Sequence, residues 1–180
     1  MSRRLSLLFL FALSLAALTA VLAGTSAGEK RPVKQAAAAP SVRRPLRIKR
    51  CPLPARFRPT FERASKQSGI ALSMLVAVAQ VESSFRPRAI SHAGARGLFQ
   101  LLPSTARELK LDPDDPDANV LAGARYLRRL LDRFSSFDLA LAAYNAGPTA
   151  VARTGSAPSA ETRAYVTEVN RRWQKLAGCT

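Results

Sequence analysis

Apolar residues recur at helical spacing along the chain from about residue 59, and almost no stretch shows the alternation of a β-strand. A first helix is predicted over residues 59–69, because Gly69 is a natural C-terminal stop. A second helix is predicted over residues 72–85, because Arg86 precedes a proline and such residues resist helical geometry. This second stretch is apolar around most of its circumference, so we expect it to be buried at the centre of the domain.

The remaining pattern predicts further helices joined by short connections. A short helix follows Pro103, and the acidic turn DPDDPDAN precedes an amphipathic helix over residues 120–134. The small, apolar stretch LALAAYNA predicts a helix that stops at Gly147, and a last helix is expected at about 160–176. Together these elements predict a single all-α globular domain.

The N-terminal region has a different pattern. Arg3 and Arg4 precede an apolar run over residues 5–23, which small residues follow. This order is typical of a secretory signal peptide, which we assign to residues 1–27, and the run is also long enough for an uncleaved membrane anchor. Either way the chain is expected to be exported, to the periplasm or the cell envelope. Residues 28–58 are assigned to a disordered basic linker and residues 59–180 to the folded domain.

The positive charge concentrates in the linker. The chain carries a formal net charge of +16, of which residues 29–58 contribute +9. Such a Pro- and Ala-rich, strongly basic stretch cannot bury enough apolar surface to fold. Residues 30–58 are either a solvated tether or a peripheral contact with membrane or acidic polymer. Export disfavours nucleic acid as a partner.

Cysteine and histidine are scarce, which limits the chemistry. Cys51 and Cys179 are the only cysteines, and an oxidising compartment would allow them to form a disulfide; the alternative is two free thiols. His92 is the sole histidine, so neither a histidine metal site nor a Ser-His-Asp triad is expected. The aspartates of residues 112–117 lack the spacing of a calcium loop and indicate turns and caps. We therefore expect no cofactor and no metal.

Glu82 is the candidate catalytic group, because it is an ionisable residue in the last turn of the apolar second helix. Burial and the negative end of the helix dipole both disfavour a carboxylate, so both raise its pKa and would keep a proton available near pH 7. The alternative is a surface glutamate that pairs with Arg86 or Arg88. The position alone does not decide between them.

The run VESSFRPRAISHAGARGLFQLLPSTA resembles the catalytic core of the soluble lytic transglycosylase (SLT) family. The resemblance continues through NVLAGARYLRRLL, ALAAYNAGP and ETRAYVTEV, in the family's order, over about residues 59–176. It implies a lysozyme-like fold and an enzyme that cleaves peptidoglycan between N-acetylmuramic acid and N-acetylglucosamine without water, leaving 1,6-anhydro ends. It makes Glu82 the sole acid and then base.

The same resemblance implies roles for the residues around Glu82. It places Ser83 near the acid or the sugar, Gln100 against the sugar amide, and the Tyr144 hydroxyl against the glutamate. It gives Asn145 to the loop or substrate and Tyr165 to the cleft wall. The alternatives are a helix-end cap for Ser83, bonding to loop carbonyls for the glutamine, and a core position for Tyr165.

Other functions also fit the sequence. A goose-type lysozyme-like hydrolase would use the same acid with a positioned water, and a non-catalytic wall-binding module would need no acid at all. The small size and the basic linker would suit an enzyme that opens the wall for a secretion or conjugation apparatus. Peptidoglycan glycan strands are the expected partner of all of these. A nucleic-acid binder would instead depend on the charge of the linker, and its affinity would fall steeply with salt.

Overall fold

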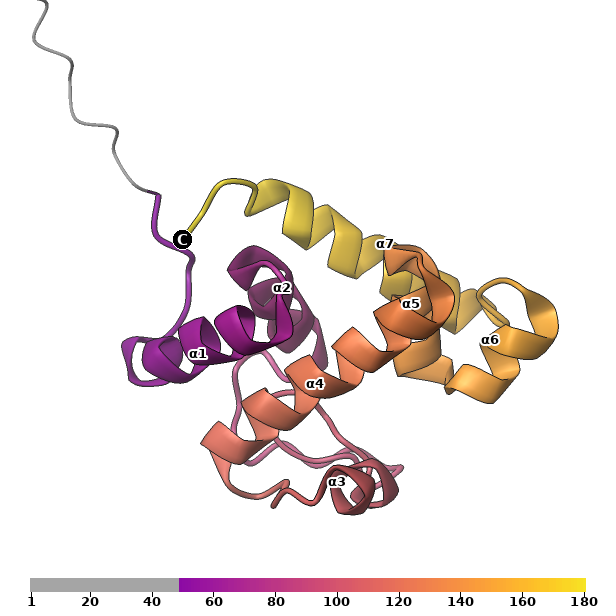
Figure 1. Cartoon of the computed structure of the whole chain (residues 1–180), viewed down its shortest axis with the longest axis horizontal. Helices are drawn as coiled ribbons and strands as arrows, with labels where there is room; N and C mark the ends of the chain where they lie inside the picture. The colour runs from indigo at the N-terminus through magenta and orange to yellow at the C-terminus, as the bar shows by residue number, and fades with distance from the viewer. Residues whose placement is uncertain (1–48) are drawn as a thin grey trace, which may run out of the picture. The chain divides into compact units, whose positions relative to one another are not determined.

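The computed structural model describes residues 49–180, which form an all-α domain as predicted (Figure 1). Within these residues there is no named strand, only three isolated bridges. The elements are a 3₁₀ turn and seven α-helices: η1 (Ala55–Phe57), α1 (Arg58–Ser68), α2 (Leu72–Glu82), α3 (Pro103–Leu109), α4 (Pro116–Phe134), α5 (Phe137–Ala146), α6 (Pro148–Thr154) and α7 (Ala160–Lys175). No helix among them is long and apolar enough to cross a bilayer.

The apolar helix α2 lies at the centre of the domain, as the sequence predicts. Its residues 73–79 are all buried, and it packs against α1 on one side and α7 on another. Helices α4 and α5 pack on each other, and they extend the core because α4 also packs on α1 and α5 on α7 (Figure 1). A helix that is apolar nearly all round is stable only in such a position, where every face is covered.

Helix α2 ends at Glu82, three residues earlier than predicted. Ser84 and Phe85 adopt left-handed φ values of 51° and 60°, which no α-helix can continue through. The turn directs the Phe85 ring onto Phe61 of α1, with 6.2 Å between ring centroids. The packing of one aromatic side chain, and not only the following proline, therefore sets the end of the helix.

The folded domain begins before residue 59, within the stretch assigned to the linker. Leu53 and Phe57 belong to the hydrophobic core, and η1 leads directly into α1. Cys51 is joined to Cys179 by a disulfide, and the Thr180 amide donates to the Lys49 carbonyl at 2.9 Å. The two edges of the domain are thus tied together. The predicted signal peptide and residues 28–48 of the predicted linker lie outside the described residues.

The second half of the domain contains one unpredicted helix and one predicted cap. Helix α6 was not predicted: the sequence analysis ended the preceding helix at Gly147 and expected no element between it and about residue 160. The acidic turn before α4 has the capping role expected of it: the Asp115 side chain accepts from the amides of Asp117 and Ala118. Asp117 in turn accepts a 2.7 Å hydrogen bond from the Thr60 hydroxyl, which joins α4 to α1.

Candidate active site

Glu82 is the last residue of α2, at the point where the loop of residues 83–102 leaves the helix. Its side chain is partly exposed. Its Oε1 atom accepts a hydrogen bond of 2.5 Å from the hydroxyl of Tyr165 on α7. The central helix thus carries the carboxyl to the edge of the core, where a phenol holds one of its oxygens.

The environment of Glu82 makes its carboxyl an unusually weak acid. Burial raises its pKa from 4.5 to about 7, and the hydrogen bond from Tyr165 opposes this rise because it favours the charged form. No other carboxylate of residues 49–180 contributes to this shift. Near neutral pH the group therefore exists in both forms, as a proton donor and a proton acceptor need to do.

The two tyrosines exchange the roles that the resemblance implied. Tyr144 was expected to hold the glutamate, but its hydroxyl donates to the Phe99 carbonyl at 2.8 Å. Tyr165 was expected to wall the cleft, and it is the residue that contacts Glu82. Burial first, and then the charge of Glu82, raise the pKa of both phenols well above 10, so both stay protonated donors.

Ser83 and Gln100 bond to the loop. The Ser83 hydroxyl is buried and donates to the Leu98 carbonyl at 2.9 Å, which corrects the expectation that it lies against the acid or sugar. Gln100 uses both of its amide hydrogens, donating to the carbonyls of Ala89 at 3.0 Å and Gly97 at 2.9 Å. With both donors committed, only the amide oxygen of Gln100 is left to accept a hydrogen bond from a substrate.

Asn145 and Asn119 lie in different surroundings. Asn145, predicted to hold the loop or substrate, is exposed on α5. Asn119, which the sequence analysis did not single out, is fully buried in α4 and accepts from the Phe99 amide at 2.8 Å while donating to the Arg96 carbonyl at 2.9 Å. The sequence feature that could have indicated this role is a polar residue next to the apolar Val120, at the start of the predicted amphipathic helix.

Gly97 shows how closely the loop approaches Asn119. Its φ of 77° lies in the left-handed region, and a Cβ atom at this position would stand 2.4 Å from the Asn119 side chain. Only glycine satisfies both demands. The loop that carries Gln100 is thereby fixed against α4.

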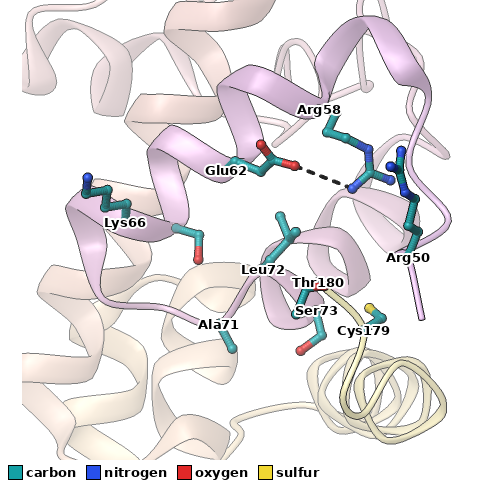
Figure 2. A pocket seen from close by; sticks show the side chains of 10 residues that line it. Arg50, Arg58, Glu62, Lys66, Ala71, Leu72, Ser73, Cys179 and Thr180 are labelled. Carbon is teal, nitrogen blue, oxygen red and sulfur yellow. Dashed lines mark ion pairs between the residues drawn. The ribbon is translucent and has the colours of Figure 1, made fainter. Parts of the chain in front are cut away.

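A large hollow lies elsewhere on the domain. It has a volume of about 720 Å³ and includes none of the predicted sugar-binding residues (Figure 2). Its walls come from α1, the start of α2 and the C-terminal segment, with Arg58 and Glu62 3.6 Å apart across one side. Since α2 spans about 15 Å at 1.5 Å per residue, this hollow is well separated from Glu82. Within residues 49–180 there is no cluster of side chains suited to a metal ion.

A buried central helix that ends in a single perturbed glutamate, within an all-α domain, defines a lysozyme-like domain. The family model described as "Transglycosylase SLT domain" matches residues 59–166. The chain belongs to this family, as the motifs around Glu82 indicated. The lytic transglycosylase Slt from Pseudomonas aeruginosa, solved as an inactive mutant, superposes on 71% of this chain with a TM-score of 0.60 and 32% identity.

Two further relatives show the same similarity. The chain is 41% identical over 100 residues to the membrane-bound lytic murein transglycosylase F of Desulfosudis oleivorans, a match that covers 51% of this chain and 22% of the relative. It is 38% identical over 120 residues to the transglycosylase of Enterobacteria phage PRD1, covering 66% and 43%. The P. aeruginosa structure is covered to 25%. The chain thus spans less than half the length of each of these relatives.

Replacing Tyr165 by phenylalanine tests the hydrogen bond to Glu82. Because this bond stabilises the carboxylate, we expect Tyr165→Phe to raise the pKa of Glu82 further, by about one pH unit. The measurement is a titration of the Glu82 carboxyl followed by carbon-13 NMR. Tyr144→Phe is the matched control, because its hydroxyl bonds to Phe99; if both variants moved the pKa equally, the assignment to Tyr165 would be wrong.

Proposed function

We propose that this chain is a lytic transglycosylase that cleaves the β-1,4 bond between N-acetylmuramic acid and N-acetylglucosamine in peptidoglycan, with Glu82 as acid and then base. The observation that supports it best is the state of the Glu82 carboxyl at the C-terminal end of the central helix. Burial raises its pKa to about 7, and the Tyr165 hydroxyl donates a hydrogen bond to it. The similar proteins are named murein transglycosylases, which supports peptidoglycan as the substrate.

In the first step the protonated Glu82 gives its proton to the glycosidic oxygen. The bond from this oxygen to C1 of the muramoyl sugar breaks, and the N-acetylglucosamine side leaves with a free hydroxyl. Positive charge develops at C1, and the N-acetyl group of the same sugar helps to stabilise it. A carboxyl with its pKa near the working pH is suited to this transfer.

In the second step the Glu82 carboxylate takes the proton from the muramoyl 6-hydroxyl. The freed oxygen closes on C1, which gives a 1,6-anhydro ring and returns the glutamate to its acid form. No water is consumed. The Tyr165 hydroxyl stabilises the carboxylate between the two steps, and the amide oxygen of Gln100 accepts a hydrogen bond from a sugar amide.

The solitary carboxylate supports this route over the two-carboxylate route of most glycosidases. Those enzymes place a second acid within about 5–10 Å of the first, as nucleophile or as base for water. Burial and the hydrogen bond from Tyr165 account for the pKa of Glu82, and no carboxylate of residues 49–180 is among the causes of its shift.

The products of peptidoglycan digestion test the proposal. Purified protein is incubated with isolated peptidoglycan, and the released muropeptides are weighed by mass spectrometry. We expect anhydro ends. Ends heavier by one water would indicate the lysozyme-like hydrolase instead, and no release from folded protein would leave only a wall-binding module.

The location of the chain is part of the same proposal. We assign it to the periplasm or the cell envelope, where its substrate lies and where a disulfide between Cys51 and Cys179 is stable. Residues 1–27 would direct export, and the basic residues before the folded domain would contact a membrane or acidic polymer. The enzyme would open the wall for a secretion or conjugation apparatus.

A further inference from the structure

Residues 96–101 form a tight hairpin within the loop that follows α2. Arg96 and Leu101 exchange both of their backbone hydrogen bonds, each at 2.9 Å, and these two bonds close the hairpin. Leu98 and Phe99 at its tip are fully buried. The backbone groups of the tip therefore need partners inside the protein, because they are removed from water.

The peptide group between Leu98 and Phe99 is held at both ends. Its carbonyl accepts a hydrogen bond of 2.9 Å from the buried hydroxyl of Ser83, the residue that follows Glu82 at the end of α2. Its N–H donates to the Oδ1 atom of Asn119 on α4 at 2.8 Å. Because a peptide group is planar and rigid, neither bond can be reoriented without the other. Asn119 is thereby connected to the end of α2 through a single peptide plane.

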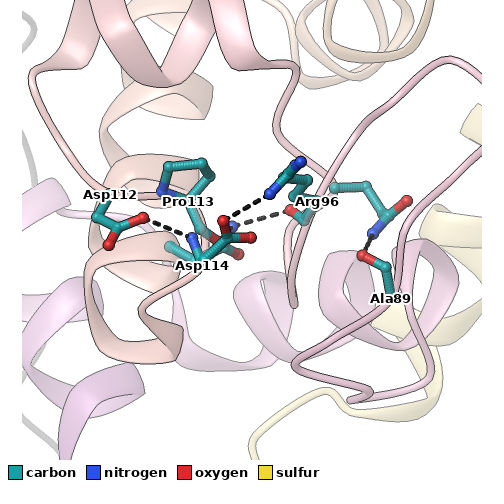
Figure 3. A network of polar contacts seen from close by, with 7 residues as sticks. Ala89, Arg96, Asp112, Pro113 and Asp114 are labelled. Atoms are coloured by element: carbon teal, nitrogen blue, oxygen red, sulfur yellow. Dashed lines mark hydrogen bonds and ion pairs between the residues drawn. The ribbon is translucent and has the colours of Figure 1, made fainter.

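The side chain of Asn119 has one defined orientation. It is fully buried, and its Nδ2 atom donates to the Arg96 carbonyl at 2.9 Å and to the Pro113 carbonyl at 3.0 Å. The Arg96 side chain also pairs with Asp114, so the hairpin and the acidic turn are joined at this point (Figure 3). An amide that uses its oxygen and both of its hydrogens in this way cannot rotate without losing bonds. Its oxygen is therefore a fixed acceptor for the peptide group of the hairpin.

The hairpin lies beside the candidate acid in space as well as in sequence. Its Phe99 carbonyl accepts from the Tyr144 hydroxyl at 2.8 Å. Burial first, and then the charge of Glu82, raise the pKa of Tyr144, so the phenol that holds the hairpin lies within the electrostatic field of the acid. The Phe99 ring rests on α4 one turn after Asn119, where a Cβ atom on Gly123 would stand 2.3 Å from it. Helix α4 thus holds both the amide and the ring of this residue.

We propose that Asn119 is a positioning residue for the reaction, which acts through the Leu98–Phe99 peptide group to fix the turn at the end of α2 and with it the direction of the Glu82 carboxyl. This inference rests on the proposed function, because it assigns a further residue to the same reaction. Asn119 is buried, so it acts on the carboxyl through the hairpin and not on the sugar. Proton transfer requires the acid within hydrogen-bond reach of the glycosidic oxygen, and a misplacement of about 1 Å costs roughly 100-fold in rate.

Two substitutions of similar size isolate the bond to the Phe99 amide. Asn119→Asp and Asn119→Leu both remove the N–H donors, but only aspartate keeps an oxygen that accepts from this amide. We expect Asn119→Leu to lower kcat on soluble glycan strands about 10–100-fold with KM unchanged, and Asn119→Asp to stay within about fivefold of the wild type. Circular dichroism verifies that each variant is folded at the assay temperature. An equal loss of kcat in both variants, or a normal kcat in Asn119→Leu, overturns the proposal.

Thr60→Val is the matched control for a general loss of stability. Thr60 is a buried polar residue of α1, and its hydroxyl donates to Asp117 of α4 at 2.7 Å. Its replacement weakens the packing of α4 without touching the hairpin, so the unfolding midpoint should fall while kcat stays unchanged. If Thr60→Val lowered kcat as much as Asn119→Leu does, loosening of α4 would explain both results and the positioning role would be rejected.

Ser83→Ala tests the same peptide group from its other end and does not require the Asn119→Leu variant to fold. We expect it to lower kcat about tenfold, because the Leu98 carbonyl then no longer holds the end of α2. Combining it with Asn119→Leu should cause little further loss, since both side chains act through one peptide plane. A normal kcat in Ser83→Ala, or losses that multiply in the double variant, would contradict the proposal.

A titration without substrate separates this inference from the proposed function. In Asn119→Leu the end of α2 is released and the Glu82 carboxyl gains water, so its pKa should fall from about 7 by about one pH unit, as followed by carbon-13 NMR. In Thr60→Val it should stay at about 7. If the wild type cleaves no peptidoglycan, the proposed function fails, and the titration still decides whether Asn119 positions Glu82. An unchanged pKa in Asn119→Leu would reject that role.

Discussion

Glu82→Gln is expected to lower the turnover of peptidoglycan by about 10²–10⁴-fold, the contribution that a positioned general acid and base makes. Glutamine keeps the shape of the side chain but has no proton to exchange, so neither step of the proposed reaction is assisted. The measurement is the rate of muropeptide release at saturating substrate. Glu108→Gln is the matched control, because that glutamate is exposed and pairs with Arg129.

The pKa of Glu82 also predicts how activity depends on pH. The first step needs the protonated acid, so the rate should fall about tenfold for each pH unit above 7. A wild type with a flat profile between pH 7 and 9 would place the catalytic proton elsewhere. Normal turnover by Glu82→Gln would contradict the site assignment altogether.

The same substitution should change stability in a pH-dependent way. The folded state binds the Glu82 proton more tightly than the unfolded state, because its pKa is about 7 rather than 4.5. The free energy of unfolding therefore falls as the pH rises from about 4.5 to 7, by up to about 3 kcal/mol. Glu82→Gln escapes this loss, so it should be more stable than the wild type at pH 8 and equally stable at pH 4.

Removing the disulfide is expected to cost the domain about 3–5 kcal/mol of unfolding free energy. The bond between Cys51 and Cys179 closes a segment with a sequence separation of 128, and long loops lose the most entropy when they are closed in the unfolded chain. The measurement is urea unfolding of the Cys51→Ala, Cys179→Ala variant beside the wild type. Its midpoint should fall while activity at low temperature persists, because both residues are remote from Glu82.

Reduction provides the control for this prediction. Dithiothreitol should shift the unfolding midpoint of the wild type to that of the double variant and leave the variant itself unchanged. If reduction has no effect on the wild type, the backbone hydrogen bonds from Cys51 and Thr180 hold the two edges together without the disulfide.

Much of the fold follows from local features of the sequence. Gly69 ends α1 in the left-handed conformation expected of a glycine stop, and Asp115 caps α4. The apolar circumference of α2 predicted its central position, since such a helix has no face that is stable in water. The position of Pro87 predicted an end of α2 that is too late. A following proline restricts only the residues next to it, whereas the observed turn depends on the contact with Phe61, 24 positions before Phe85.

The sequence by itself determined every helix except α6, the caps and the identity of the candidate acid, because periodicity, turn chemistry and motif are properties of adjacent residues. Only the tertiary structure decided which phenol holds Glu82. Tyr144 and Tyr165 both sit on inward faces of helices, so their patterns are equivalent. The packing of α7 on α2 brings the Tyr165 hydroxyl to the Glu82 carboxyl, 83 positions away in the sequence. The Tyr144 hydroxyl donates instead to the Phe99 carbonyl of the loop.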